Sequence, residues 1–213
     1  MLRQDGISAV VINRLPRYYR VLTTLMEKQV ERISSKEFAQ LIGLTASQIR
    51  QDLNCFGGFG QQGYGYNVRS LRAEIARILA LGNLKPTILI GTGNIGAALV
   101  SHTDFSAYGF QLMDIFDSNA GLIGKQIGGY VVRDAAALKA YCKEFAPKVA
   151  VLCVPTDTAK EIVDLLVEQN ITAFWNFTHF DIELKYSGKV VVQNVHLGDS
   201  LMALSYFTGN VVE

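Results

Sequence analysis

The sequence predicts two parts: a helical N-terminal part of winged-helix type, then an α/β part built on a parallel, doubly wound sheet. Two short helices joined by a Gly-containing turn fall within residues 34–53. Beyond residue 86 the apolar pattern changes to strands that alternate with helices. A glycine-rich turn joins the first of these strands to a helix. The fold class is therefore α/β with a separate helical domain in front.

The composition is that of a folded protein, since 49% of the 213 residues are apolar and 18% are charged. The three cysteines, Cys55, Cys142 and Cys153, are too few and too widely spaced for a disulfide framework. We therefore expect a reducing, cytoplasmic environment. The first 20 residues do not resemble a signal peptide, and no apolar run is long enough to span a bilayer. We expect no membrane association.

The first helices are predicted from periodicity and capping signals. Residues 17–28 have apolar side chains at a helical period, and Pro16 stands where a helix can begin. Ser34 and Glu37 have the spacing of a capping box, and Gly43 ends the short helix that follows. These signals predict the first helix and the first half of a helix-turn-helix.

The second half begins at Thr45, which with Gln48 forms another predicted capping box. The run 56–66 alternates glycines with aromatic residues, a pattern that favours a small hairpin over a helix. Helix, helix-turn-helix and hairpin in this order describe a winged helix. The same local geometry occurs in proteins that bind no DNA, so a polar face on a helical bundle stays open as an alternative.

A helix over residues 68–81 leads to a break marked by Gly82, Asn83 and Pro86. We place the first domain at residues 1–82 and the second at 83–195. The second domain has strands at 87–90, 111–116, 149–154, 173–176 and 190–192, and helices at 94–102, 135–145 and 158–169. Residues 196–213 form a terminal segment, with an amphipathic helix over 197–207.

The glycine-rich turn has the spacing of a dinucleotide-binding loop. The first glycine allows a tight turn, the second lets the backbone approach a pyrophosphate, and the third lets the helix pack on the strand. Asp117 ends the next strand 21 positions after the last glycine, where a ribose-binding carboxylate favours NAD over NADP. The alternative is a glycine-rich turn without a ligand. The loop residues are Gly91, Thr92, Gly93, Asn94, Ile95 and Gly96.

The helix after the turn offers side chains suited to base edges, because Arg can pair with guanine and Gln with adenine. Residues 1–85 hold 12 Lys or Arg against six Asp or Glu, which is compatible with nucleic acid or with an ordinary solvated surface. The wing contains Gln61 and Gln62 but no Lys or Arg. The candidate DNA-binding residues are Ser47, Gln48, Arg50, Gln51, Gln62 and Tyr64.

The sequence contains no recognisable catalytic motif. His102, His179 and His196 stand in no recognisable catalytic motif, and no metal-ligand spacing occurs. We therefore expect a binding protein rather than an enzyme, and no metal. An NAD-dependent oxidoreductase with a helical appendage remains the alternative. A third possibility is a nucleotide-binding module that uses its winged helix for protein contacts, although Arg50 favours DNA over that.

Taken together, these residues resemble the Rex family of redox-sensing transcriptional repressors. The resemblance extends in order along essentially the whole chain, and the recognition-helix run joined to the wing is its most specific part. The matching segments are residues 48–53, 56–60, 63–68, 91–96, 115–117, 127–129, 154–155, 176–177 and 193–195.

The resemblance implies a homodimer that binds a palindromic operator with NAD+ or no ligand and is released by NADH. It also implies a Rossmann domain in which NADH and NAD+ compete, with Val154 and Pro155 at the cofactor. The C-terminal helix would be swapped onto the partner through Leu201, Leu204 and Phe207.

Three departures from the family pattern matter. Gln51 stands where a lysine is common, and Gln61 and Gln62 stand where the wing is usually basic, so DNA affinity or its salt dependence is expected to be lower. His196 replaces an aspartate that pairs with an arginine of the first helix, here Arg20. His102 replaces a tyrosine near the nicotinamide. These histidines suggest a pH-sensitive redox switch, which a flat pH response of operator release would contradict.

Overall fold

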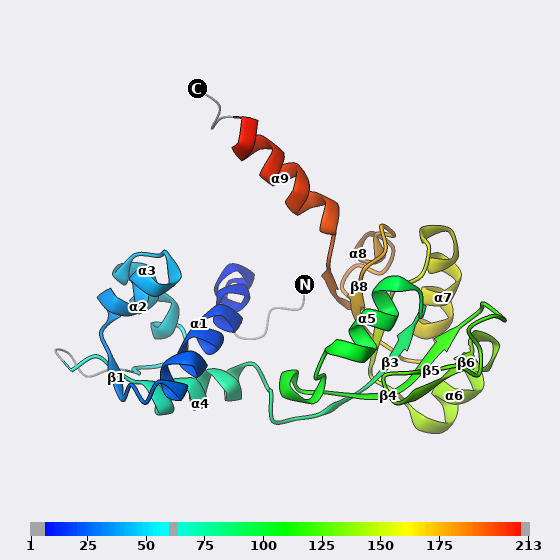
Figure 1. Ribbon diagram of the computed structural model, residues 1–213, viewed down its shortest axis with the longest axis horizontal. Coiled ribbons are helices and arrows are strands. Elements are labelled where there is room, and N and C mark those ends of the chain that lie inside the picture. Colours follow the sequence, from blue (N-terminus) through cyan, green and yellow to red (C-terminus); the bar gives the residue numbers. More distant parts are fainter. Residues whose placement is uncertain (1–6, 60–63, 210–213) are drawn as a thin grey trace. The chain divides into compact units, whose positions relative to one another are not determined.

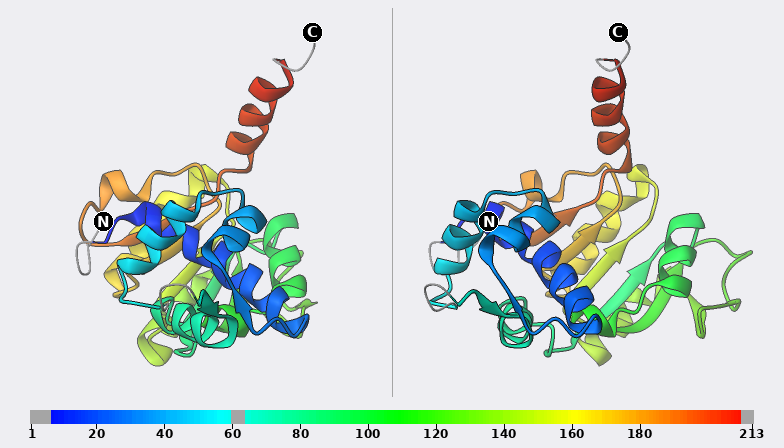
Figure 2. Two further views of the ribbon diagram at one scale, coloured as in Figure 1. Left: turned by 90° about the vertical axis from the view of Figure 1, so that its left-hand side faces the viewer. Right: turned by 60° about the vertical axis from the view of Figure 1, so that its left-hand side comes forward.

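The computed structural model describes residues 7–59 and 64–209. The chain divides into two compact units between Asn83 and Leu84, each with a hydrophobic core of its own. Figure 1 and Figure 2 show the first unit in blue to teal and the second from green to red. Among the described helices, none is long and apolar enough to cross a membrane.

The first unit is helical, with one short antiparallel strand pair. Its elements are α1 (Ala9–Glu27), β1 (Arg32–Ile33), α2 (Ser35–Ile42), α3 (Ala46–Asn54), β2 (Tyr66–Asn67) and α4 (Val68–Ile78). Leu15, Tyr18, Phe38, Ile49 and Ile75 are fully buried, so all four helices contribute to one core. This is the helical part that the sequence predicted.

The helix α1 begins earlier than predicted, and Pro16 lies inside it. Ser8 begins the helix, because its side chain accepts the N–H of Val10. Leu15 is buried on the same helix, ahead of the proline. The prediction that Pro16 starts the helix was wrong because burial and capping of the preceding turns outweigh the lost N–H donor.

The capping box of α2 is confirmed. Ser34 Oγ accepts the Glu37 N–H at 3.1 Å, and a Glu37 carboxylate oxygen accepts the Ser34 N–H at 2.9 Å. Only half of the second box forms. Thr45 Oγ1 accepts the Gln48 N–H, but the Gln48 side chain donates to Asp52 instead of returning to Thr45.

The strand pair lies at the base of the predicted wing. Tyr66 pairs with Ile33 and Asn67 with Arg32, so β2 finds its partner in a segment before α2 rather than in residues 56–59. Gly65 has φ +68°, and a Cβ there would lie 2.6 Å from the Ile33 carbonyl oxygen. Residues 60–63 lie outside the described part of the chain, so the hairpin tip stays a prediction.

The second unit contains a sheet of order β5-β6-β4-β3-β7-β8-β9 in which every pairing except β5–β6 is parallel. The strands are β3 (Lys85–Ile90), β4 (Phe110–Asp117), β5 (Gln126–Ile127), β6 (Tyr130–Asp134), β7 (Val149–Leu152), β8 (Ala173–Asn176) and β9 (Val191–Asn194). The chain order reverses at β3, which confirms the doubly wound Rossmann-type sheet. The carboxyl ends of β3, β4 and β7 therefore border the crevice at the switch point.

Helices cover the two faces of this sheet unequally. The main elements are α5 (Asn94–His102), α6 (Leu138–Phe145), α7 (Thr156–Glu168) and α8 (Ile182–Lys185), with 3-10 turns at Ser106–Tyr108 and Ala135–Ala137. Residues of α6, α7 and α8 share one core with the sheet, whereas α5 packs into the core on the other face. A short β5–β6 hairpin, which the sequence reading missed, takes the place of a crossover helix after β4.

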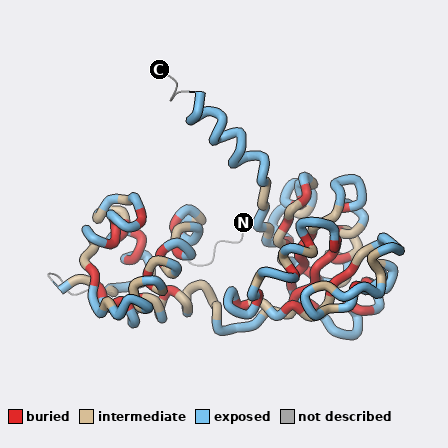
Figure 3. The backbone as a smooth tube through the Cα atoms, viewed as in Figure 1, coloured by how far each residue is buried: buried red, intermediate tan, exposed pale blue. Residues whose placement is uncertain are grey.

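The C-terminal helix α9 (Leu197–Gly209) has no buried residue in this single chain, and Figure 3 shows it exposed along its length. Leu201 and Leu204 belong to the predicted apolar stripe, but Met202 and Tyr206 on the opposite side are also 67% and 69% exposed. The helix is therefore apolar on more than one side, unlike the one-sided helix predicted. Such a helix is normally buried in an assembly.

Candidate functional site

The glycine loop is built from three glycines with different constraints. A Cβ at Gly91, which has φ +93°, would lie 2.5 Å from the Cys153 carbonyl oxygen. A Cβ at Gly96 would lie 1.9 Å from the Gly91 carbonyl oxygen. Nothing lies within 4 Å of the Cβ position at Gly93. The packing of the protein itself therefore requires glycine at positions 91 and 96, whereas at Gly93 the backbone remains accessible to a ligand.

Asp117, at the end of β4, holds the loop in place. One carboxylate oxygen accepts the Thr92 N–H at 2.6 Å and the Thr92 hydroxyl at 2.9 Å, while the other accepts the Asn119 N–H at 2.8 Å. Burial raises the pKa of Asp117, but these hydrogen bonds outweigh burial and hold the pKa below its usual value. Asp117 is therefore ionised at neutral pH.

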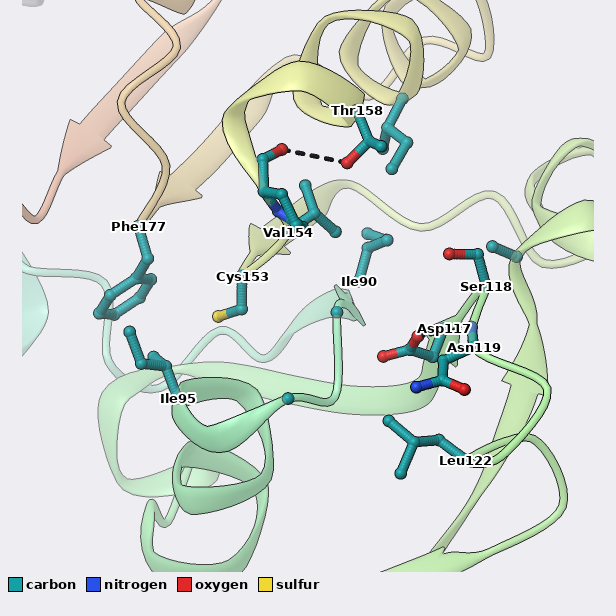
Figure 4. A pocket seen from close by; sticks show the side chains of 15 residues that line it. Ile90, Ile95, Asp117, Ser118, Asn119, Leu122, Cys153, Val154, Thr158 and Phe177 are labelled. Atoms are coloured by element: carbon teal, nitrogen blue, oxygen red, sulfur yellow. Dashed lines mark hydrogen bonds between the residues drawn. The ribbon is translucent and has the colours of Figure 1, made fainter.

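A cavity of about 470 Å³ opens at the carboxyl ends of β3, β4 and β7. Figure 4 shows its two ends: Asp117 and Asn119 lie on one side, and Cys153, Ile95 and Phe177 lie on the other. The lining residues are Ile90, Gly91, Gly93, Ile95, Asp117, Ser118, Asn119, Leu122, Ala135, Cys153, Val154, Pro155, Thr158, Ile162 and Phe177. The cavity therefore has a polar end and an apolar end.

Six of the predicted cofactor residues line this cavity: Gly91, Gly93, Ile95, Asp117, Val154 and Pro155. Thr92 is buried and bonded to Asp117, and Asn94 and Gly96 lie in the first turn of α5. The sequence reading missed several lining residues, among them Ser118, Asn119 and Phe177. A signal for them existed, because each follows the carboxyl end of a parallel strand.

Two helices begin at the cavity. The residue before α5 is Gly93 and the residue before α7 is Pro155, and both line it. Neither Gly93 nor Pro155 caps its helix with a side chain, although the Asp157 carboxylate accepts the Thr158 N–H in the first turn of α7. The N–H groups of the first turns, together with the helix dipoles, suit a bound anion such as a pyrophosphate.

The apolar end contains one titratable group, the thiol of Cys153. Burial raises the pKa of Cys153 to about 12, so the thiol is neutral at physiological pH. Ile95 and Phe177 lie beside it (Figure 4). This end of the cavity therefore presents an uncharged surface.

In the first unit, α3 presents the predicted DNA-binding side chains. Ser47 and Gln51 are exposed. Gln48 donates through Nε2 to Asp52 at 2.8 Å, and Arg50 donates to the Ser35 hydroxyl at 3.0 Å. Two of the four candidates on this helix are thus held in position by the protein itself.

Asp52 is the centre of a network that sequence reasoning did not find. It is 1% exposed and accepts two hydrogen bonds from Arg14 at 2.6 Å, one from the Tyr18 hydroxyl at 2.5 Å and one from Gln48. Burial raises the pKa of the Asp52 carboxyl, but these bonds outweigh burial and lower it below the usual value. The network fixes α3 against α1.

At the wing, Tyr64 is 68% exposed. The Arg32 guanidinium donates to the Tyr64 carbonyl oxygen at 3.3 Å and lies 5.9 Å from the centre of its ring. Arg32, on β1, thus supplies a positive charge at the base of the wing, whose own run of residues 56–66 contains no Lys or Arg. The two-residue strand that places Arg32 there has no sequence signal of its own. Gln62 lies outside the described residues.

Two family models match the chain: a "putative DNA-binding protein N-terminus" over residues 6–54 and a "CoA binding domain" over residues 83–180. A redox-sensing transcriptional repressor Rex of Clostridium perfringens is 47% identical over 206 residues, which cover 97% of this chain and 96% of that protein. The Rex of Clostridium acetobutylicum is 46% identical over 96% of this chain and 95% of its own length. This chain belongs to the Rex family.

Solved structures of the Rex-family repressor RSP agree with this assignment. Its complex with β-NAD+ and operator DNA matches with a TM-score of 0.90 at 44% identity, over 97% of this chain and 94% of RSP. Its complex with β-NADH matches with a TM-score of 0.88 at 42% identity, over 97% and 96%. The expected architecture, an N-terminal DNA-binding domain followed by a Rossmann-type parallel sheet, is confirmed.

The remaining Rex-type candidates lie outside the cavity. His196 Nδ1 is 3.5 Å from the Asp199 carboxylate, and its ring lies 5.4 Å from that of His179. Arg20 is exposed on α1. Leu201, Leu204 and Phe207 are exposed on α9. The pairing of Arg20 with His196 and the helix swap stay predictions.

Proposed function

We propose that this protein is a cytoplasmic transcriptional repressor that binds NADH or NAD+ in the second unit and a palindromic operator through the first. The observation that carries the proposal is the cavity at the switch point, lined by the glycine loop and bordered by the N-termini of α5 and α7. The full-length relatives are repressors rather than enzymes, so the oxidoreductase alternative is not favoured.

The two ends of the cavity support one direction for the dinucleotide. The pyrophosphate lies over Gly93, where the backbone is open and the helix N-termini favour an anion. The adenosine ribose lies toward Asp117, whose negative charge disfavours a 2′-phosphate. The nicotinamide then reaches the end formed by Ile95, Cys153 and Phe177.

The apolar end supplies a reason for redox discrimination. NADH and NAD+ share every phosphate and ribose, so the glycine loop binds both equally. The oxidised ring is cationic and the reduced ring is neutral, and an uncharged surface disfavours the cation. NADH therefore binds more tightly here than NAD+ does. To release the repressor from DNA, NADH must in addition bind the DNA-free state more tightly than the DNA-binding state, because only that difference shifts the equilibrium between the two states.

The repressor acts as a homodimer. A groove of about 680 Å³ lies along the sheet, where residues of β3, β7, β8 and β9 line it. Phe105, Tyr108 and Trp175 line this groove. An unpartnered apolar groove and an unpartnered apolar α9 on the same chain are complementary, which supports burial of both between two copies. The swapped helix of the Rex resemblance is one such arrangement.

The test of the repressor function is a gel shift of the purified protein with DNA from promoter regions of its host. We expect a specific shift that NADH abolishes and NAD+ leaves intact. Arg50→Ala should weaken the shift, whereas Lys143→Ala on α6 of the second unit is the matched control. The absence of any specific shift would refute the repressor, and a shift insensitive to both nucleotides would refute the sensor.

The test of the dimer is sedimentation of the full chain, whose monomer mass is 23.4 kDa. We expect twice that mass, and loss of the dimer when Leu201 and Leu204 are both changed to Glu. Asp199→Glu on the same helix controls for a general effect of substitution in α9. A wild-type monomer at micromolar concentration would contradict the proposal.

A further inference from the structure

The polar end of the cavity contains a second group besides Asp117, the side-chain amide of Asn119. Its oxygen accepts the Gly121 N–H at 2.8 Å, and a Cβ at Gly121 would lie 3.2 Å from the same oxygen. This bond identifies which atom of the amide is the oxygen, so the opposite end of the group is the NH2. Asn119 also lines the cavity, beside Asp117 and Leu122 (Figure 4).

The NH2 group of Asn119 has no hydrogen-bond partner among the described residues. The backbone of Asn119 is fully engaged, because its N–H donates to Asp117 and its carbonyl accepts from Leu122 and Ile123. The backbone is therefore fixed in place, while the exposed side chain has two donors available at the edge of the cavity.

Asp117 by itself offers a ribose only acceptors. Both of its oxygens already accept hydrogen bonds from the protein, and its main structural effect is to hold Thr92 and the glycine loop. A ribose hydroxyl both donates and accepts a hydrogen bond. A carboxylate satisfies the donor half of that hydroxyl and leaves its oxygen without a partner.

Resting on the proposed dinucleotide function, we propose that Asn119 is a specificity-determining residue whose side-chain NH2 donates to the 2′-oxygen of the adenosine ribose. Asp117 accepts the proton of the same hydroxyl through a remaining lone pair. The ribose hydroxyl is thus recognised by a donor, Asn119, and an acceptor, Asp117, which lie close together at the end of β4.

The test compares ADP with 2′-deoxy-ADP as competitors that displace NADH from the full-length protein, followed by NADH fluorescence. Wild-type protein should prefer ADP. Asn119→Asp keeps the oxygen that accepts the Gly121 N–H but removes the donor, so it should reduce this preference roughly two- to tenfold. Gln126→Glu, an exposed amide-to-carboxylate change on β5 outside the cavity, is the matched control and should keep the wild-type preference.

Because the readout is a ratio of two ligands on one variant, losses of overall affinity cancel. Asn119→Ala should reduce the preference like Asn119→Asp, which separates loss of the donor from gain of a charge. An unchanged preference in both variants would overturn the inference and leave the dinucleotide function intact. A wild-type protein that binds NADH without preferring ADP over 2′-deoxy-ADP would do the same. Failure of the wild-type protein to bind NADH would overturn the proposed function and this inference together.

Discussion

Two carboxylates, Asp52 in the first unit and Asp117 in the second, are surrounded by hydrogen-bond donors, but the donors differ in kind. Asp52 is bonded only to side chains, of Arg14, Tyr18 and Gln48, and is 1% exposed. Asp117 is bonded to two backbone N–H groups, of Thr92 and Asn119, and to the Thr92 hydroxyl, and it borders a cavity. The first charge is enclosed, and the second still faces a space that a ligand can enter.

The difference separates a structural carboxylate from a binding one. A buried charge is tolerated only when it is paired and hydrogen-bonded, and Asp52 meets that condition without any ligand. Asp117 is only partly surrounded by hydrogen-bond donors of the protein, because the side of its carboxylate that faces the cavity remains open. Substitutions around Asp52 should therefore change stability, and substitutions around Asp117 should change what the cavity binds.

The largest effect is expected for Arg14→Ala. The change leaves a buried Asp52 carboxylate without its cationic partner, which should lower the free energy of unfolding by about 3 kcal/mol. Denaturant unfolding followed by circular dichroism measures it. Arg17→Ala, an exposed arginine on the same helix, is the control and should change stability by less than about 0.5 kcal/mol. Equal losses in the two variants would show that the Asp52 network is not structural.

A second prediction compares two glycines of the same loop. Gly96→Ala forces a Cβ against the Gly91 carbonyl and should destabilise the second unit by about 2 kcal/mol. Gly93 has φ −65°, which alanine adopts, and open space around its Cβ position, so Gly93→Ala should leave stability unchanged. The added methyl group should nevertheless lower NADH affinity by about tenfold or more. Thermal unfolding and NADH titration of both variants measure this split, and a Gly93→Ala protein with normal NADH affinity would contradict it.

The sequence predicted the Asp117 region better than the Asp52 region, for a physical reason. The glycine loop is local: three glycines within six residues, between a strand and a helix, determine its geometry. Asp52 is 38 positions from Arg14 and 34 from Tyr18, and no local pattern reports such a contact. The early start of α1 was missed for a related reason, since burial of Leu15 depends on helices later in the chain.

Short strands were missed because β1, β2 and β5 have only two residues each, which gives no measurable period, and β6 has only five. The β1–β2 pair and the β5–β6 hairpin both depend on partners brought together by the rest of the fold. As a result, two residues at the candidate sites were missed. Arg32 and Asn119 were not identified, because one lies in a two-residue strand and the other in the turn after β4.

The two carboxylates should also be distinguishable by acid titration. The pKa of each is lower than its usual value in the folded chain, so each stabilises the fold fully above the unfolded pKa near 3.8. This contribution is lost as the pH falls below that value and the carboxyls become protonated. Asp52→Asn should flatten the acid limb of a stability curve measured from about pH 5 to about pH 2 in the absence of ligand. A curve that Asp52→Asn leaves unaltered would contradict the assignment.

The smallest effect is expected for Asp117→Asn, read as a ratio of NADH to NADPH affinity. The ionised carboxylate lies at the polar end of the cavity, where it repels the 2′-phosphate of NADPH. Removing the charge should shift the ratio toward NADPH by roughly tenfold, while both affinities fall because the Thr92 N–H loses a charged acceptor. Glu144→Gln removes an exposed carboxylate of the same unit outside the cavity and should leave the ratio unchanged. If Asp117→Asn lowers the NADH and NADPH affinities equally, Asp117 only holds the glycine loop and does not select the cofactor. Asp117 would then be a structural carboxylate like Asp52, even though one side of it faces the cavity.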